Sequence, residues 1–144
     1  MFQEYHDHSL EREQHIARSI LIVEDDEDIG AYLVTAIKQE TAHHPLLVME
    51  SQQALEAVER IKPDLFLLDY RLRDCNGIDL YDQLHAMAGL EAIPAIIMSA
   101  SLPGRRLEEE IKQRQLFALS NPHTLDELIE TLEQALPVSA GNAC

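Results

Sequence analysis

The sequence ILIVEDD at residues 20–26 joins a continuous apolar run to an acidic cluster. Four consecutive apolar residues, rich in β-branched side chains, are typical of a strand that is buried on both faces of a parallel sheet. Asp26 is suited to cap a following helix, because its side chain can accept hydrogen bonds from the free N–H groups of the first turn. The next apolar residues recur at three- and four-residue intervals and predict one buried stripe: Ile29, Tyr32, Leu33, Ala36 and Ile37.

The same strand and helix unit repeats along the rest of the chain. Further apolar runs predict strands at residues 46–49, 65–68, 95–98 and 116–119. The signals that begin or end the predicted helices are a cap at Ser51, the turn DCNG at 74–77, the break Pro103-Gly104, the capping box TLDE at 124–127 and the stop at Pro137. The last helix has Leu125 on its predicted apolar face. Five strands, each followed by a helix, predict an α/β protein with a doubly wound five-stranded parallel sheet and five helices.

Length and charge exclude several classes of function. A chain of 144 residues fits one domain, and 11 Lys and Arg against 26 Asp and Glu give a formal net charge of −15, which would repel nucleic acid and an anionic membrane. No apolar run approaches the roughly 20 residues that a spanning helix needs, and the acidic first residues lack the features of a signal peptide, so we expect a cytoplasmic protein. Cys75 and Cys144 have no metal spacing and are expected to be free thiols.

Polar side chains follow the predicted strands at the edge of the sheet where such folds bind ligands. Glu24 and Asp25 follow the first strand, Asp69 the third, Ser99 the fourth and Asn121 the fifth. If the first and third strands are neighbours, three carboxylates meet, and their repulsion is relieved by a hard divalent cation such as Mg²⁺. An Asp beside such an ion is able to act as a nucleophile toward a phosphoryl group.

Several motifs in register resemble the receiver domain of two-component response regulators, over about residues 19 to 136. They are ILIVEDD at 20–26, DLFLLDYRLRDCNG at 64–77, AIIMSA at 95–100 and ALSNPHTLDEL at 118–128. The layout is similar to that of the single-domain chemotaxis regulators. The resemblance implies a flavodoxin-like receiver fold with strand order 2-1-3-4-5 and a cis bond between Asn121 and Pro122.

The resemblance also implies roles for individual residues. Asp69 would be the phospho-acceptor and Ser99 the switch hydroxyl, with Ala100 beside it among the cofactor-binding residues. Asp25 would bind Mg²⁺ directly, Glu24 directly or through water, and Arg71 through its backbone carbonyl, with Asp69 completing the metal site.

Four positions depart from the family's pattern. Asn121 stands where the family usually has a Lys, and Ala118 where it usually has an aromatic switch residue. Arg73 replaces a usual Pro, and His123 a usual Phe. Because Asn brings no positive charge to a phosphoryl group, we expect slower phosphorylation or weaker coupling to the output, with Arg71 as a candidate source of the missing charge.

Three functions fit these observations to different degrees. The first is a stand-alone receiver, not an enzyme, that accepts a phosphoryl group from a histidine kinase or phosphotransfer protein and signals by altered binding to a downstream protein. The second is a docking module that acts without phosphorylation, which Asn121 and Ala118 favour and the three retained acids oppose. An aspartate-nucleophile phosphatase is disfavoured, because Arg71 stands where such enzymes need a second acid.

The expected organisation is an N-terminal extension at residues 1–18, a receiver domain at 19–137 and a C-terminal tail at 138–144. We expect a monomer or weak homodimer that binds neither nucleic acid nor membrane.

Overall fold

The computed structural model describes residues 16–100 and 104–136. Within them a five-stranded parallel sheet has the order β2-β1-β3-β4-β5, as the sequence predicts. The strands are β1 (Ser19–Val23), β2 (His44–Val48), β3 (Leu65–Asp69), β4 (Ala95–Ala100) and β5 (Phe117–Asn121), and the helices are α2 (Glu27–Glu40), α3 (Ser51–Ala57), α4 (Gly77–His85), α5 (Arg105–Gln113) and α6 (Leu125–Ala135). The predicted helix signals at Pro103 and Pro137, the thiol of Cys144, the tail at 138–144 and most of the extension at 1–18 lie outside the described residues.

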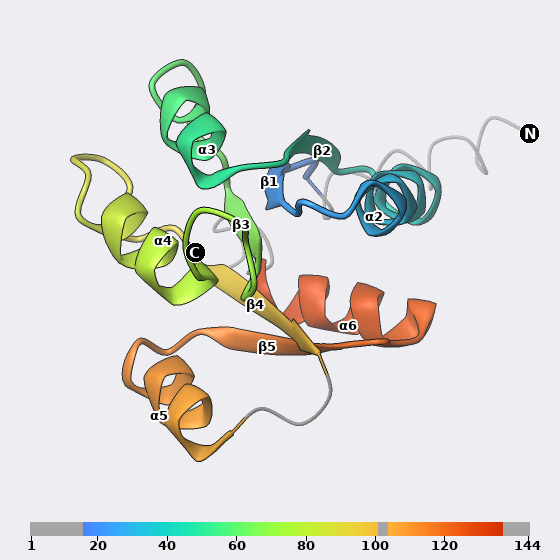
Figure 1. The fold of residues 1–144 in the computed structure, drawn as a ribbon. Helices are drawn as coiled ribbons and strands as arrows, with labels where there is room; N and C mark the ends of the chain where they lie inside the picture. The colour runs from blue at the N-terminus through green and yellow to red at the C-terminus, as the bar shows by residue number, and fades with distance from the viewer. Residues whose placement is uncertain (1–15, 101–103, 137–144) are drawn as a thin grey trace, which may run out of the picture.

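Alternate residues of each central strand face the two sides of the sheet, and both sides are covered by helices (Figure 1). Ile20, Ile22, Leu65 and Leu67 pack with α2 and α6 in one cluster. Residues such as Leu21, Phe66, Leu68 and Ile97 pack with α3, α4 and α5 in the other. Burial on both faces explains why β1 and β3 are continuous apolar runs in the sequence.

Two helix starts show how the local sequence sets the fold. The Asp26 side chain accepts hydrogen bonds from the N–H groups of Asp28 and Ile29, so it caps α2 as predicted. Thr124 and Glu127 form the predicted capping box at the start of α6. Both caps satisfy N–H groups that a helix leaves without an intrahelical partner.

Some predicted positions differ in the structure. Ser51 is the first residue of α3 rather than its cap, and its hydroxyl donates to the Asp74 carboxylate instead of to the helix. The second strand begins at His44, because pairing with Ser19 of β1 sets its start, not the apolar run that begins later. Tyr32 and Leu125, placed on buried faces by the sequence pattern, are 41% and 38% exposed. They lie at the margins of their helices' apolar stripes, beyond the contact with the sheet.

Candidate metal and phosphoryl site

The carboxyl ends of β1 and β3 bring three acidic side chains together. Val23 pairs with Leu68 in the sheet, so Glu24 and Asp25, which follow β1, lie beside Asp69 at the end of β3. Carboxylate oxygens from the three residues lie within 4.8 Å of one another. The sequence predicted this meeting from strand order alone, and the structure contains it.

Glu24 is the most buried member of the cluster, with 1% of its surface exposed. Its Oε2 accepts the N–H of Asp26 at 3.1 Å, while its Oε1 is buried and has no hydrogen-bond partner among the described residues. Burial raises the pKa of Glu24 from its ordinary 4.5 to about 8, and the nearby carboxylates of Asp69 and Asp25 push it in the same direction. Without a cation, the raised pKa values of Glu24 and Asp69 favour retention of a proton within this pair of carboxylates.

Asp69 is half-buried at the last position of β3, and burial raises its pKa as well. The side chain of Glu24 and the backbone N–H of Arg71, which donates to Oδ1 of Asp69 at 3.2 Å, lower this pKa and so work against the effect of burial. Gly77 lets α4 begin close to this strand end, because a Cβ at that position would lie 2.6 Å from the backbone oxygen of Asp69.

The remaining predicted residues lie at the ends of the next two strands. Asp69 pairs with Met98, the residue before Ser99, and Ser99 is 8% exposed. Ala100 is exposed and pairs with Asn121 at the end of β5. The bond between Asn121 and Pro122 is cis. The predicted residues at the strand ends thus share one edge of the sheet: Glu24, Asp25, Asp69, Ser99, Ala100 and Asn121.

Arg73 adds a contact that the sequence did not predict. Its Nε lies 3.9 Å from Oδ2 of Asp25, so a guanidinium reaches the acidic cluster from the loop between β3 and α4. The sequence makes Arg71 the candidate source of positive charge, and its charge does affect Asp69, but the ion pair belongs to Arg73. The only available signal was the replacement of a usual Pro by Arg.

The donor set fits a hard divalent cation. It consists of carboxylate oxygens, with the backbone carbonyl of Arg71 next to them in sequence, and oxygen is the ligand that Mg²⁺ prefers. The buried Oε1 of Glu24 supports this fit, because a cation can take the place of the proton that otherwise relieves the repulsion among the three carboxylates.

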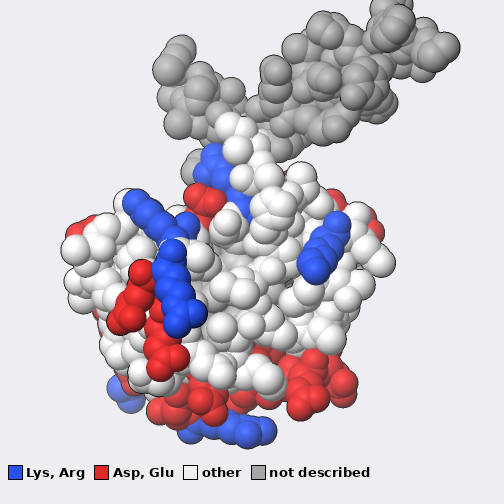
Figure 2. All heavy atoms as spheres, turned by 90° about the horizontal axis from the view of Figure 1, so that it is seen from above, with Lys and Arg blue, Asp and Glu red and all other residues white. Residues whose placement is uncertain are grey.

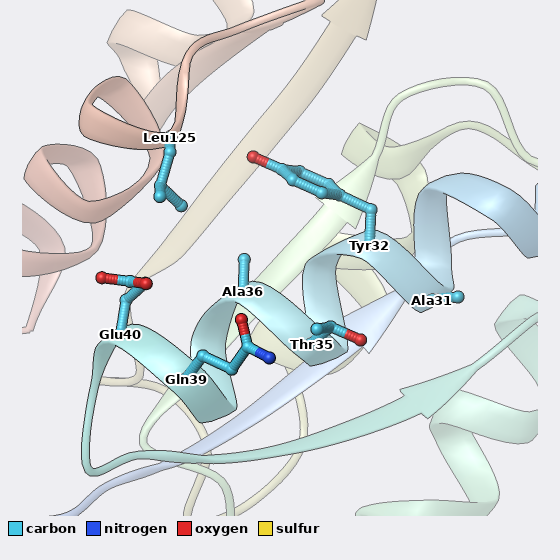
Figure 3. A pocket seen from close by; sticks show the side chains of 7 residues that line it. All are labelled: Ala31, Tyr32, Thr35, Ala36, Gln39, Glu40 and Leu125. Carbon is cyan, nitrogen blue, oxygen red and sulfur yellow. The ribbon is translucent and has the colours of Figure 1, made fainter.

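A separate groove of about 350 Å³ lies between α2 and α6 (Figure 3). Tyr32 and Leu125 face one another across it, and the ring of Tyr32 also contacts His123 with centroids 5.8 Å apart. Its other lining residues are Ala31, Thr35, Ala36, Gln39 and Glu40. The groove shares no residue with the carboxylate cluster and offers apolar surface rather than reactive groups.

The acidic side chains on the surface agree with the excess of Asp and Glu in the composition. On the face in Figure 2, acidic side chains gather along one edge, and much of the middle is uncharged. No helix in the described part of the chain combines the length and the apolar character that a bilayer crossing requires.

The acidic cluster beyond β1 and β3 lies at the carboxyl edge of the sheet, which is where doubly wound parallel sheets bind their ligands. Residues 20–133 match the response regulator receiver domain, and the chain belongs to that family. Its members are phospho-accepting proteins of two-component signalling rather than enzymes; receiver domains typically bind Mg²⁺ and interact with histidine kinases.

Individual relatives agree with this assignment. The DNA-binding response regulator MtrA of Mycolicibacterium smegmatis is 35% identical over 81 residues, which are 56% of this chain and 34% of that protein. The chain therefore spans about a third of the length of this curated relative. The structure of a sensor protein from Polaromonas sp. JS666 is 27% identical, with a TM-score of 0.73 over 83% of this chain and 95% of that one. The chemotaxis protein CheY4 of Vibrio cholerae shares the fold, with a TM-score of 0.77 and 15% identity over 84% of this chain and 100% of that one.

Proposed function

We propose that Asp69 accepts a phosphoryl group from a histidine kinase or phosphotransfer protein, and that the phosphorylated domain signals by altered binding to a downstream protein. The observation that carries this proposal is the half-buried Asp69 at the end of β3, within 4.8 Å of two further carboxylates. A carboxylate nucleophile needs little covalent assistance in such a transfer, and positioning and charge neutralisation provide most of the catalysis.

In the proposed transfer, a carboxylate oxygen of Asp69 forms a bond to phosphorus. The phosphorus–nitrogen bond of the donor phosphohistidine breaks, and its electron pair stays on the imidazole nitrogen. The N–H of Arg71 orients Asp69 through its hydrogen bond to Oδ1. Ser99, with its hydroxyl at the end of the adjacent strand β4, would donate a hydrogen bond to a phosphoryl oxygen, with Ala100 and Asn121 beside it.

Glu24, Asp25 and Asp69, with the backbone carbonyl of Arg71, would hold Mg²⁺. When bound, the ion would neutralise charge on the carboxylates and on the incoming phosphoryl group. Glu24 would give up its proton for this, because its pKa of about 8 keeps the carboxyl protonated at neutral pH in the absence of a cation.

The proposed organisation follows the family match. Residues 19–137 would form the receiver domain, with an extension at 1–18 and a tail at 138–144. We propose a cytoplasmic monomer or weak homodimer. The apolar groove between Tyr32 and Leu125 is a surface on which a protein partner would find both apolar contact and the nearby carboxylate of Glu40.

A second candidate is a docking module that binds its partner irrespective of phosphorylation. Asn121 and Ala118 favour it, since neither can act as the usual Lys or aromatic switch of the family. The buried carboxyl of Glu24 disfavours the docking module. A protein that binds no cation gains nothing from three clustered carboxylates, one of them buried.

Incubation with acetyl phosphate and Mg²⁺, followed by intact-mass measurement, separates the two functions. The first predicts a mass gain of one phosphoryl group that is lost in Asp69→Asn. Asp79→Asn, which removes one exposed carboxylate from the first turn of α4, is the control and should be labelled like the parent. An unlabelled parent, or labelling that survives Asp69→Asn, contradicts the proposed phospho-acceptor.

A further inference from the structure

The carboxyl edge of the sheet carries three clustered carboxylates but has no lysine to balance them. The chain has three lysines, and all lie toward the opposite edge: Lys38 in the last turn of α2, Lys62 before β3 and Lys112 in the last turn of α5. Asn121, at the end of β5, is uncharged. The arginines that follow strand ends at this edge are Arg71 and Arg73 in the loop after β3, and Arg105 and Arg106 in the first turn of α5. Arg73 forms an ion pair with the acidic cluster.

The loop between β3 and α4 provides that charge through Arg73. Its Nε lies 3.9 Å from Oδ2 of Asp25, whose side chain is 20% exposed. The carboxylate oxygens of Asp25 and Asp69 lie within 4.8 Å of each other, so a guanidinium at Asp25 is within one side chain's reach of a group bonded to Asp69.

The residues on both sides of Arg73 are held in place. Leu72 donates its N–H to the carbonyl of Cys75 at 3.1 Å, and Arg71 forms a β-bridge with Asn76, which closes the loop into a tight turn. On the other side, Asp74 accepts hydrogen bonds from the hydroxyl and the N–H of Ser51 at the start of α3.

The bonds from Ser51 also engage the acidic side chain next to Arg73. They hold the pKa of the neighbouring Asp74 below its ordinary value and occupy both of its oxygens. The guanidinium of Arg73 pairs with Asp25. The Arg73 side chain itself is 79% exposed, so it is free to leave Asp25 when a better anion arrives.

We propose that Arg73 is the phosphoryl-binding cation of this site: it pairs with Asp25 in the metal-free protein and donates hydrogen bonds to the phosphoryl oxygens on Asp69. A guanidinium is suited to this, because its planar donors match two phosphate oxygens at once. The inference rests on the proposed function, since it assumes that Asp69 is the acceptor. The inference also gives Arg73 a second effect: it weakens Mg²⁺ binding, because the guanidinium and Mg²⁺ compete for Asp25.

The test compares Arg73→Ala and Arg73→Lys with Arg60→Ala, which removes the same charge from an exposed position after α3. The initial rate of labelling by acetyl phosphate is followed by intact mass. In that reaction the Asp69 oxygen bonds to phosphorus, the bond from phosphorus to the acetyl oxygen breaks, and acetate leaves with the electron pair. Mg²⁺ affinity is measured separately, without phosphate, from the rise in melting temperature with metal concentration.

We expect Arg73→Ala to be labelled at least about tenfold more slowly than Arg60→Ala, the loss expected for a charge-assisted hydrogen bond. Arg73→Lys should retain part of the rate. Mg²⁺ should bind Arg73→Ala about two- to fivefold more tightly than Arg60→Ala, the range of an exposed ion pair. A purely structural role would not slow labelling and tighten metal binding together.

The possible failures are distinguishable. If the parent is labelled and Arg73→Ala is labelled as fast as Arg60→Ala, the role of Arg73 is refuted and the proposed function stands. If the parent is not labelled, the proposed phospho-acceptor fails, and phosphoryl binding by Arg73 is refuted with it. If labelling slows but Mg²⁺ affinity does not rise, Arg73 does not compete at Asp25, and the ion-pair part of the inference is overturned.

Discussion

The buried carboxyl of Glu24 links protein stability to both pH and Mg²⁺. In the folded protein its pKa is about 8, against an ordinary value of 4.5, mainly because of burial. Between these two pH values, the folded state therefore holds a proton that the unfolded state has lost. The sign follows directly: in the absence of metal, the free energy of unfolding decreases as pH rises from 4.5 to about 8.

The size of this effect follows from the same linkage. Each pH unit inside that window costs up to roughly 1.4 kcal/mol per proton, so a change from pH 5 to pH 7 should lower stability by roughly 2 to 3 kcal/mol from this group alone. Bound Mg²⁺ reverses the cost, because it stabilises the ionised carboxylates. At a metal concentration of 100 Kd the gain is about 2.7 kcal/mol, and it should grow with pH as the proton becomes easier to displace.

Glu24→Gln isolates the contribution, since the amide resembles the protonated carboxyl in shape and has no proton to lose. Urea unfolding from pH 5 to 8 in EDTA should show a smaller decrease in stability for Glu24→Gln than for the parent, and the variant should respond weakly to Mg²⁺. Glu27→Gln, at an exposed position in the first turn of α2, is the matched control and should follow the parent. Identical pH slopes for the parent and Glu24→Gln in EDTA would refute the reasoning.

Three further predictions test other parts of the structure. Asn121→Lys should speed labelling by acetyl phosphate and weaken Mg²⁺ binding, because a cation at this strand end favours the phosphoryl group and repels the metal; unchanged values for both would mean that position 121 does not face the site. Gly77→Ala should lower the free energy of unfolding by about 1–3 kcal/mol in urea titrations, because its Cβ would lie 2.6 Å from the Asp69 carbonyl oxygen; a neutral result would contradict the close approach. Burial lowers the pKa of His43, whose Nδ1 accepts the N–H of Arg18 at 3.0 Å, so its contribution to stability is present above pH 6.5 and is lost as pH falls through the lower folded pKa; a His43→Gln variant with the parent's acid slope in urea unfolding would argue against this.

The fold was predictable because the central strands are buried on both faces. Residues 20–23 of β1 and 65–68 of β3 are apolar and buried without interruption, and residues 95–98 of β4 show the same pattern. The edge strand β2 was placed less accurately, since it is only half-buried and its start depends on pairing with β1. Tyr32 and Leu125 show the same limit: helical periodicity gives the centre of an apolar stripe, but where burial ends depends on the spacing of α2 and α6.

The sequence determines where the three acids of the site lie, but it does not determine where the side chain of Arg73 lies. Glu24, Asp25 and Asp69 follow strands whose ends are fixed by sheet register, so topology alone brings them together. Arg73 lies in a loop, where no periodicity sets the direction of a side chain, and it contacts Asp25 from the turn that the bond between Leu72 and Cys75 closes. A strand-end lysine would be read directly from the sequence. A counter-charge supplied by a loop requires the structure, and for this chain that is where the charge balance of the site is decided.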